Sequence, residues 1–309
     1  MKIIFMGTPD FSVPTLETLI NSKHDVIGVV AQPDRPKGRG KKLVSPPTID
    51  VAKAHGIPVK QPLNARSKKF LEWLQQSKAD IAVVVAYGKI LSRKVLTTPK
   101  LGCINLHASL LPKYRGAAPI HWAVINGELE TGVCTMQMDE GMDTGPVFME
   151  QKLSISPNDT TGNLWETLSK MGAPLVLETL ERIEQKSIKP RSQVNDLATY
   201  APMISKNDAL IDWNRPVKDI FNKIRGMTPW PGAWCLHREN RLKVWKTEIS
   251  GKPSTSDPTG TIVGFDSGIL VNTSDGILRI CQAQLPGKKQ SSALDLINSK
   301  KIAIQDRLH

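Results

Sequence analysis

The first two-thirds of the chain alternates continuous apolar runs with stretches whose apolar residues recur at helical spacing. Such runs predict strands that are covered on both faces of a sheet. They occupy residues 3–6, 26–31, 79–86, 101–107 and 133–138. Helices are predicted over residues 11–21, 120–126 and 160–185. The alternation of strands and helices predicts a Rossmann-like, doubly wound α/β domain.

The start of the first predicted helix carries two local signals. Ser12 is expected to be its N-cap, and Pro14 lies in its first turn. The preceding segment 7–10 reads Gly-Thr-Pro-Asp and lacks the second and third glycines of a dinucleotide fingerprint. We therefore expect a tight strand-to-helix turn there rather than a dinucleotide site.

The pattern changes in the last third of the chain. Residues 186–206 are polar and show no clear period, which predicts a linker. Short apolar runs separated by Gly-containing turns follow, and they predict a small β-barrel. These runs are residues 241–247, 260–264, 269–273 and 277–283. We expect a catalytic domain over residues 1–189, a linker over 190–206 and a smaller C-terminal domain over 207–309.

The 309-residue chain carries a net charge of +12, which makes a polyanionic partner, first of all nucleic acid, plausible. Its four cysteines stand far apart without metal-ligand spacing, so we expect free thiols and no metal. The apolar opening is too short for a signal peptide, and no run approaches the roughly 20 apolar residues of a membrane span. We expect a cytoplasmic protein without a membrane partner.

A short Pro-flanked segment concentrates part of the positive charge. Residues 34–42 read Asp-Arg-Pro-Lys-Gly-Arg-Gly-Lys-Lys. We expect its cations to contact nucleic-acid phosphates, although a solvated charged loop is the alternative. The candidate contact residues are Arg35, Lys37, Arg39, Lys41 and Lys42.

Chemistry-bearing residues gather where the strand 101–107 ends. Asn105 and His107 share one face of this strand, because side chains at i and i+2 point the same way. Asp143 follows about 35 residues later in an Asp-Thr-Gly turn. An amide and an imidazole can donate to an oxygen that becomes negative, and a carboxylate can take a proton from an amine. The set therefore suits direct acyl transfer to an amine, with the acyl donor left open.

The loop after this strand continues the pattern. Ser109, Leu110, Leu111 and Pro112 follow it directly, at the strand edge where α/β proteins bind ligands. A purely structural crossover is the alternative.

These motifs resemble a known family. The segments 105–107 and 109–116, with the later Asp143, resemble the signature of folate-dependent formyltransferases. Further segments resemble the branch of this family that acts on methionyl-tRNA, and the resemblance spans nearly the full length. They are residues 5–11, 32–36, 38–42, 84–88, 211–213, 229–231 and 244–246.

The resemblance implies formyl transfer from 10-formyltetrahydrofolate to the α-amino group of methionine on initiator tRNA. It implies catalytic roles for Asn105, His107 and Asp143, and a C-terminal OB-like barrel that contacts the tRNA. Arg39 would lie in the loop that the family uses on the acceptor stem, and we expect a monomer. The implied folate site comprises Ser109, Leu110, Leu111, Pro112, Tyr87 and Gly88.

Two other functions are alternatives to formylation of methionyl-tRNA. The first is formylation of a small amine, such as a sugar nucleotide or glycinamide ribotide, which would not need a basic loop or a basic second domain. The second is nucleic-acid binding without catalysis, which the intact set of Asn105, His107 and Asp143 disfavours.

Overall fold

The computed structural model describes residues 1–37, 40 and 42–309, and the chain divides into two compact units. Each unit is assembled from three chain segments. Unit 1 comprises Met1–Pro119, Thr131–Ser154 and Trp165–Ala201. Unit 2 comprises Ile120–Glu130, Ile155–Leu164 and Pro202–His309.

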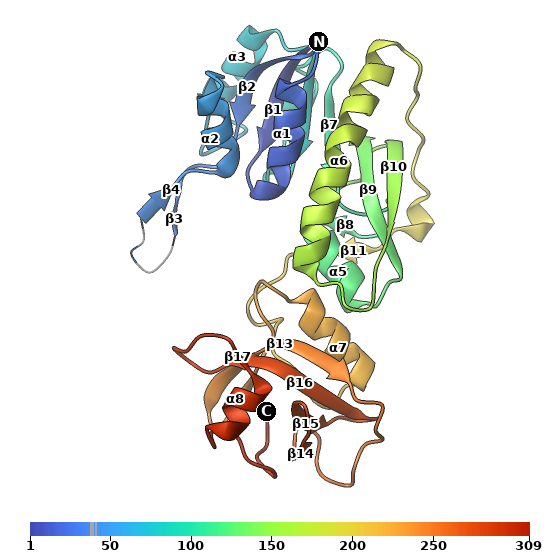
Figure 1. The fold of residues 1–309 in the computed structure, drawn as a ribbon. Helices are drawn as coiled ribbons and strands as arrows, with labels where there is room; N and C mark the ends of the chain where they lie inside the picture. Colours follow the sequence, from blue (N-terminus) through green and yellow to red (C-terminus); the bar gives the residue numbers. More distant parts are fainter. Residues whose placement is uncertain (38–39, 41) are drawn as a thin grey trace. The chain divides into compact units, whose positions relative to one another are not determined.

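Unit 1 is built around a seven-stranded sheet in the order β10-β9-β7-β6-β1-β2-β5 (Figure 1). The strands β5, β2, β1, β6 and β7 pair in parallel, each with its neighbour in that order. The apolar runs predicted as strands are confirmed. The bounds are β1 (Lys2–Gly7), β2 (Asp25–Val30), β5 (Val59–Lys60), β6 (Ile81–Val85), β7 (Cys103–His107), β9 (Glu130–Gln137) and β10 (Val147–Ser154).

The sheet is mixed rather than wholly parallel. β9 runs antiparallel to β7, with Asn105 opposite Met136 and His107 opposite Cys134. The apolar pattern of residues 133–138 predicts this strand but carries no signal of its direction. One antiparallel strand beside a parallel core is common in large α/β sheets.

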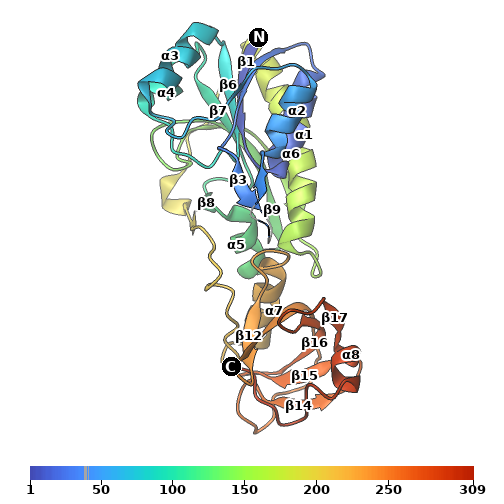
Figure 2. The same ribbon diagram turned by 90° about the vertical axis from the view of Figure 1, so that its left-hand side faces the viewer.

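Helices cover both faces of the sheet, which confirms the doubly wound architecture (Figure 2). Figure 2 shows α1, α2 and α6 on one face and α3 and α4 on the other. The bounds are α1 (Val13–Ile20), α2 (Pro47–Ala54), α3 (Lys68–Ser77), α4 (Arg93–Leu96) and α6 (Thr161–Glu184). The first four residues of α6 belong to unit 2 and the rest to unit 1.

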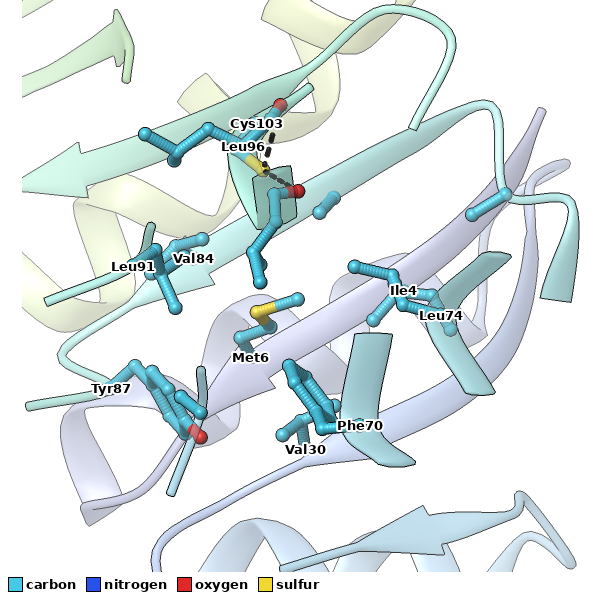
Figure 3. Packing of buried hydrophobic residues seen from close by; sticks show 14 residues of the cluster. Ile4, Met6, Val30, Phe70, Leu74, Val84, Tyr87, Leu91, Leu96 and Cys103 are labelled. Atoms are coloured by element: carbon cyan, nitrogen blue, oxygen red, sulfur yellow. Dashed lines mark hydrogen bonds between the residues drawn. The ribbon is translucent and has the colours of Figure 1, made fainter. Parts of the chain in front are cut away.

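Figure 3 shows the core between the sheet and α3 and α4. Ile4 and Met6 of β1 pack there with side chains from both helices, and Cys103 of β7 joins them. The Cys103 thiol approaches the carbonyl oxygen of Leu96 at 3.6 Å. Because side chains alternate along a strand, Asn105 and His107 project from the same face of β7 as Cys103.

Ser12 is the N-cap residue of α1, as predicted, but its side chain does not cap the helix. A short 3-10 helix (Asp10–Ser12) precedes α1, and the Ser12 hydroxyl makes no capping hydrogen bond. It donates instead to the carbonyl oxygen of Val85 at 2.7 Å. The residue thus ties the start of α1 to β6, while Pro14 lies in the first turn as predicted.

Two small strand pairs complete unit 1. β3 (Arg35–Lys37) and β4 (Lys42–Val44) form an antiparallel hairpin from the predicted basic loop. β8 (Arg115–Gly116) pairs in parallel with β11 (Tyr200–Ala201), which lies within the predicted linker.

Unit 2 is an antiparallel sheet in the order β12-β13-β16-β15-β14, with α7 (Val217–Gly226) packed against β13. The C-terminal tail bridges both edges, because Leu308 pairs with His237 and Arg307 with Thr261. These bridges curl the sheet toward a barrel and agree with the predicted OB-like domain. The strand bounds are β12 (Trp234–His237), β13 (Asn240–Ile249), β14 (Ile262–Phe265), β15 (Ile269–Asn272), β16 (Ile277–Gln284) and β17 (Ser291–Ser292).

Helix α5 (Pro119–Ile125) matches the helix predicted over 120–126, and α8 (Ala293–Asn298) follows β17. Across the described part of the chain, no helix combines the length and apolarity that crossing a lipid bilayer requires.

Candidate active site

The carboxyl-terminal half of β7 carries the first two predicted catalytic side chains. Asn105 is 9% exposed and His107 is 6% exposed. No hydrogen bond joins the side-chain amide of Asn105 to another described residue, and its atoms are not among the fully buried polar atoms that lack a partner. The amide atoms are open to water or to a ligand, either of which can complete their hydrogen bonds. Asn105 is therefore available to donate to a bound substrate.

The ring of His107 is fixed by a backbone group. Its Nε2 lies 3.0 Å from the carbonyl oxygen of Tyr114. A carbonyl oxygen accepts hydrogen bonds and cannot donate them, so Nε2 carries the proton. Nδ1 lies 3.6 Å from Oδ2 of Asp143. In the neutral ring, Nδ1 is therefore the nitrogen without a proton, and it lies on the side of the carboxylate.

Asp143 comes to this place from the loop between β9 and β10. Its Oδ2 accepts a hydrogen bond from the backbone N–H of Gly116 at 2.9 Å, while Oδ1 makes none within the described residues. The backbone of Asp143 is left-handed, with φ of 54°. The structure therefore brings Asp143 beside His107, as the sequence predicts, and leaves one carboxylate oxygen open.

The Asp-Thr-Gly turn needs its glycine for close packing. A Cβ at Gly145 would lie 1.8 Å from the carbonyl oxygen of Gln137 on β9. Only glycine allows the turn to lie against this strand. The close approach fixes where the chain leaves Asp143 and enters β10.

Three residues support the site in roles that the sequence does not predict, although two of them, Arg115 and Gly116, lie in the segment 109–116 that resembles the family signature. Gln193 donates to the carbonyl oxygens of Asp143 and Gly145 and accepts from Arg115, which is 3% exposed. Gln193 lies in the polar segment predicted as a linker, where no periodic signal distinguishes it. Gly116 supports the site through its backbone N–H, which binds Asp143, and a sequence pattern does not predict backbone hydrogen bonds of this kind.

Two cysteines border the site but are unsuited to be nucleophiles. Cys103 precedes Asn105 on β7, and Cys134 of β9 lies opposite His107. Burial raises the pKa of each thiol to about 12. Both remain protonated at neutral pH, and a protonated thiol is a poor nucleophile. This agrees with transfer of an acyl group directly between bound substrates.

The residues predicted to bind folate lie in different surroundings. The Ser109 hydroxyl donates to the carbonyl oxygen of Lys113 at 2.6 Å, and Leu111 packs in a small cluster with Cys134. The ring of Tyr87 belongs to the core in Figure 3, and Gly88 after it is exposed. Leu110 and Pro112 are half-buried. Their role in folate binding stays a prediction.

A surface pocket that the sequence does not indicate lies at the amino-terminal end of β7, and none of the six predicted folate residues lines it. It has a volume of about 510 Å³ and is lined by α4, by the residues just before β7 and by the segment after β9. Gly102 on its wall leads into β7, and Asp139 and Glu140 lead toward Asp143. Arg93 and Glu140 form an ion pair of 3.5 Å at its rim. The pocket thus adjoins both chain segments that carry the predicted catalytic residues.

The basic loop is described in part. Arg35 and Lys42 are exposed, and Lys37 pairs with Lys42 across the hairpin through its backbone. The predicted contacts Arg39 and Lys41 lie outside the described residues. Asp34 holds the base of the hairpin, because its carboxylate accepts from Gln61 at 2.7 Å and from Ser45 at 3.2 Å.

Sequence comparison relates both units to one family. The family model described as formyl transferase matches residues 1–180, and the model described as formyl transferase, C-terminal domain, matches residues 203–301. The methionyl-tRNA formyltransferase of Geobacter metallireducens is 48% identical over 300 residues, which cover 96% of this chain and 95% of that protein. That of Ruminiclostridium cellulolyticum is 44% identical over 310 residues, with coverage of 100% and 99%.

A solved structure shares the fold. A sugar 3N-formyl transferase, determined in the presence of dTDP and 5-N-formyl-THF, superposes with a TM-score of 0.69 at 20% identity. The match covers 94% of this chain and 99% of that one. The family models and the full-length similarity to curated relatives lead to one conclusion: the chain belongs to the methionyl-tRNA formyltransferase family.

Proposed function

We propose that this protein transfers a formyl group from 10-formyltetrahydrofolate to the α-amino group of methionine on initiator methionyl-tRNA. We further propose that it acts as a monomer in the cytoplasm. The observation that carries the proposal is the approach of Asp143 to His107 beside the unpartnered amide of Asn105. Membership of the family supplies the identity of donor and acceptor.

In the proposed reaction, the amine nitrogen bonds to the formyl carbon and the bond from that carbon to the folate nitrogen breaks. Asn105 donates to the formyl oxygen as negative charge develops on it. Oδ1 of Asp143 takes the proton that the amine loses, directly or through a water molecule. The folate nitrogen gains a proton as it leaves, so the overall proton count balances.

His107 is proposed to tune the carboxylate. Its Nε2 is occupied by Tyr114, so Nδ1 is the ring atom that can exchange a proton or stabilise charge near Asp143. The imidazole therefore interacts with Asp143 through Nδ1. If His107 also donates a hydrogen bond to the formyl oxygen, Nδ1 must be the donor atom.

The folate is proposed to bind along the crevice at the end of β7. The half-buried Leu110 and Pro112 and the exposed Gly88 can meet it, and the backbone of Ser109, Leu111 and Tyr87 supports them. A separate pocket of about 510 Å³ at the start of β7 is also large enough for a fused ring, since ligand pockets start near 300 Å³.

The tRNA is proposed to contact both parts of the chain. Arg35, Lys37, Arg39, Lys41 and Lys42 would meet phosphates. In unit 2, Arg241 lies over the ring of Trp234 at 4.0 Å and Lys243 lies 5.1 Å from the ring of Trp245. Cations next to aromatic rings suit a nucleic-acid surface.

We propose a matching division of labour along the chain. Residues 1–189 carry the formyltransferase chemistry, residues 207–309 bind tRNA, and residues 190–206 connect the two. Within the connecting segment, residues 190–201 have their contacts in unit 1.

The test is formyl transfer from radiolabelled 10-formyltetrahydrofolate to four acceptors in parallel. They are initiator methionyl-tRNA, elongator methionyl-tRNA, uncharged initiator tRNA and an amino-sugar nucleotide. We expect product with the first acceptor at a kcat/KM far above the others. Preference for the amino sugar would instead support small-amine formylation, which the net charge of +12 disfavours.

A further inference from the structure

The side-chain amide of Gln193 spends its whole hydrogen-bonding capacity next to Asp143. Its Nε2 donates to the carbonyl oxygens of Asp143 at 2.8 Å and Gly145 at 2.6 Å. Its Oε1 accepts from Nε of Arg115 at 3.1 Å and from Nη2 at 2.8 Å. A primary amide offers two donor hydrogens and two acceptor lone pairs. All four are used here, so the orientation of the amide is fully determined.

Together with the hydrogen bond from Gly116 to Asp143, these bonds form a closed chain of contacts that links Asp143, Gln193 and Arg115. Arg115 is almost fully buried, and the next residue, Gly116, donates its N–H to Oδ2 of Asp143. Gln193 therefore links the backbone of Asp143 to the strand β8 that binds the side chain of Asp143. Movement of either segment would change the position of the carboxylate relative to His107.

The backbone at Asp143 needs such support. Aspartate adopts a left-handed conformation more readily than most residues, but the region is sparsely populated, so surrounding contacts help to hold it in place. The two carbonyl groups that Gln193 binds lie on either side of the turn at Thr144. These two bonds add to the hydrogen bond that the Thr144 hydroxyl donates to the carboxylate of Asp139 at 2.7 Å, and together they fix the direction of the turn.

We propose that Gln193 is a positioning residue, which sets the carboxylate of Asp143 against His107 through the backbone without touching substrate. The inference rests on the proposed catalytic role of Asp143. It also assigns a function to the connecting segment, because Gln193 lies between α6 and β11.

The variant Gln193→Glu separates positioning from folding. Glutamate keeps an oxygen that can pair with Arg115, so the interaction with the buried cation is retained. Its second oxygen cannot donate to the carbonyl groups of Asp143 and Gly145. We expect kcat to fall roughly 10- to 100-fold, because small misplacements of a catalytic group cost that much. The melting temperature and the KM values for folate and tRNA should stay close to wild type.

Gln193→Ala should lower kcat to a similar extent and also reduce stability. Val194→Ala is the matched control, because Val194 is the neighbouring residue, is 59% exposed and takes no part in this closed chain of contacts. It should behave as wild type. The pH profile of kcat should shift in Gln193→Ala, which adds no charge beside Asp143, since the separation of His107 and Asp143 sets their mutual electrostatic influence. A purely structural role would leave this profile unchanged.

Asp143→Asn is measured alongside in the full-length enzyme. If Gln193→Glu acts through Asp143, adding it to Asp143→Asn should lower kcat by less than its effect in the wild type. If Gln193→Glu keeps the wild-type kcat and Gln193→Ala keeps the wild-type pH profile, while Asp143→Asn is inactive, this inference is overturned and the catalytic role of Asp143 stands. Full activity of Asp143→Asn would instead overturn the proposed catalytic role.

Discussion

His107 and Tyr114 are joined by a hydrogen bond of 3.0 Å in which the ring Nε2 donates to the backbone carbonyl oxygen. This bond orients the imidazole, so that Nδ1 faces the carboxylate of Asp143. A backbone partner of this kind fixes both the tautomer and the ring plane of a functional histidine. The orientation underlies the first prediction.

His107→Ala and Asp143→Asn should each lower the single-turnover rate of formyl transfer by roughly 100- to 10,000-fold, the range of general acid–base catalysis. The double variant should be little worse than the poorer single variant, because the two groups act as a unit. Rates that multiply in the double variant would show that the two residues act independently.

Asn105→Ala should reduce kcat by roughly 100- to 1000-fold, the usual effect of removing one donor to a developing oxyanion. Asn105→Asp keeps the shape of the side chain but cannot donate when ionised, so it should be at least as damaging. Folate affinity, measured by fluorescence titration, should change little in Asn105→Ala. Near-normal turnover in both variants would exclude the oxyanion role.

A fragment ending at residue 201 should be more stable than one ending at residue 189. The longer fragment retains β11, which pairs with β8, and Gln193, which binds beside Asp143. Thermal unfolding followed by circular dichroism, together with limited proteolysis of the 109–118 loop, compares the two. Both should bind tRNA much more weakly than the full chain, and equal stability of the fragments would contradict a role for this segment.

Arg35→Ala and Lys42→Ala should each weaken tRNA binding. Each should also reduce the slope of log affinity against log salt by about 0.7 to 0.9, the value expected when one cation no longer neutralises a phosphate. Lys68→Ala on α3 removes an exposed lysine that pairs with Glu72, and it should leave the slope unchanged. Arg39→Ala should also lower discrimination between initiator and elongator tRNA. A salt slope that is the same in every variant would contradict the proposed role of the hairpin.

The stability of unit 2 should depend on Asp306 in acid. Burial alone would raise the pKa of Asp306, but hydrogen bonds from His237, from the Ala303 N–H and from Arg238 outweigh it and lower the pKa from 3.8 to about 2. The folded state then binds the proton less readily than the unfolded state. Asp306 therefore contributes to the free energy of unfolding of unit 2 above about pH 4, and this contribution disappears as the pH falls toward 2.

This prediction is tested by thermal unfolding of the wild type and of Asp306→Asn between pH 5 and pH 2. The wild type should be more stable at pH 5, and the difference should narrow steadily at lower pH. A difference that does not change with pH would show that Asp306 contributes nothing through its charge.

The sequence predicts the parallel core because burial on both faces leaves a plain mark. The run Ile81–Val85 and the end of β7 are recognisable from apolar continuity and side-chain alternation. The direction of β9 is not recognisable, because a strand has the same pattern read in either sense. The β3–β4 hairpin is also hidden, since charge dominates its composition and masks its pairing.

The residues of the candidate site also fall into two groups, those that the sequence predicts and those that it does not. Asn105, His107 and Asp143 can be proposed from their chemistry and from their places at strand ends and turns, and their catalytic roles stay a prediction. The partners that hold Asp143 in place cannot be proposed in this way, because Gly116 acts through its backbone and Gln193 lies in a segment without periodicity. Ser12 looks like a helix cap, yet tertiary packing gives its hydroxyl a nearer partner in Val85.

The left-handed backbone of Asp143 restricts which amino acids this position can accept. Glycine, asparagine and aspartate adopt such a conformation at low cost, whereas other residues are strained in it. Among those three, aspartate alone carries a carboxylate. A change to glutamate, conservative in charge, would therefore meet a backbone barrier as well as an extra methylene group. The identity of the proposed base is thus constrained twice, by the reaction and by the turn on which it stands.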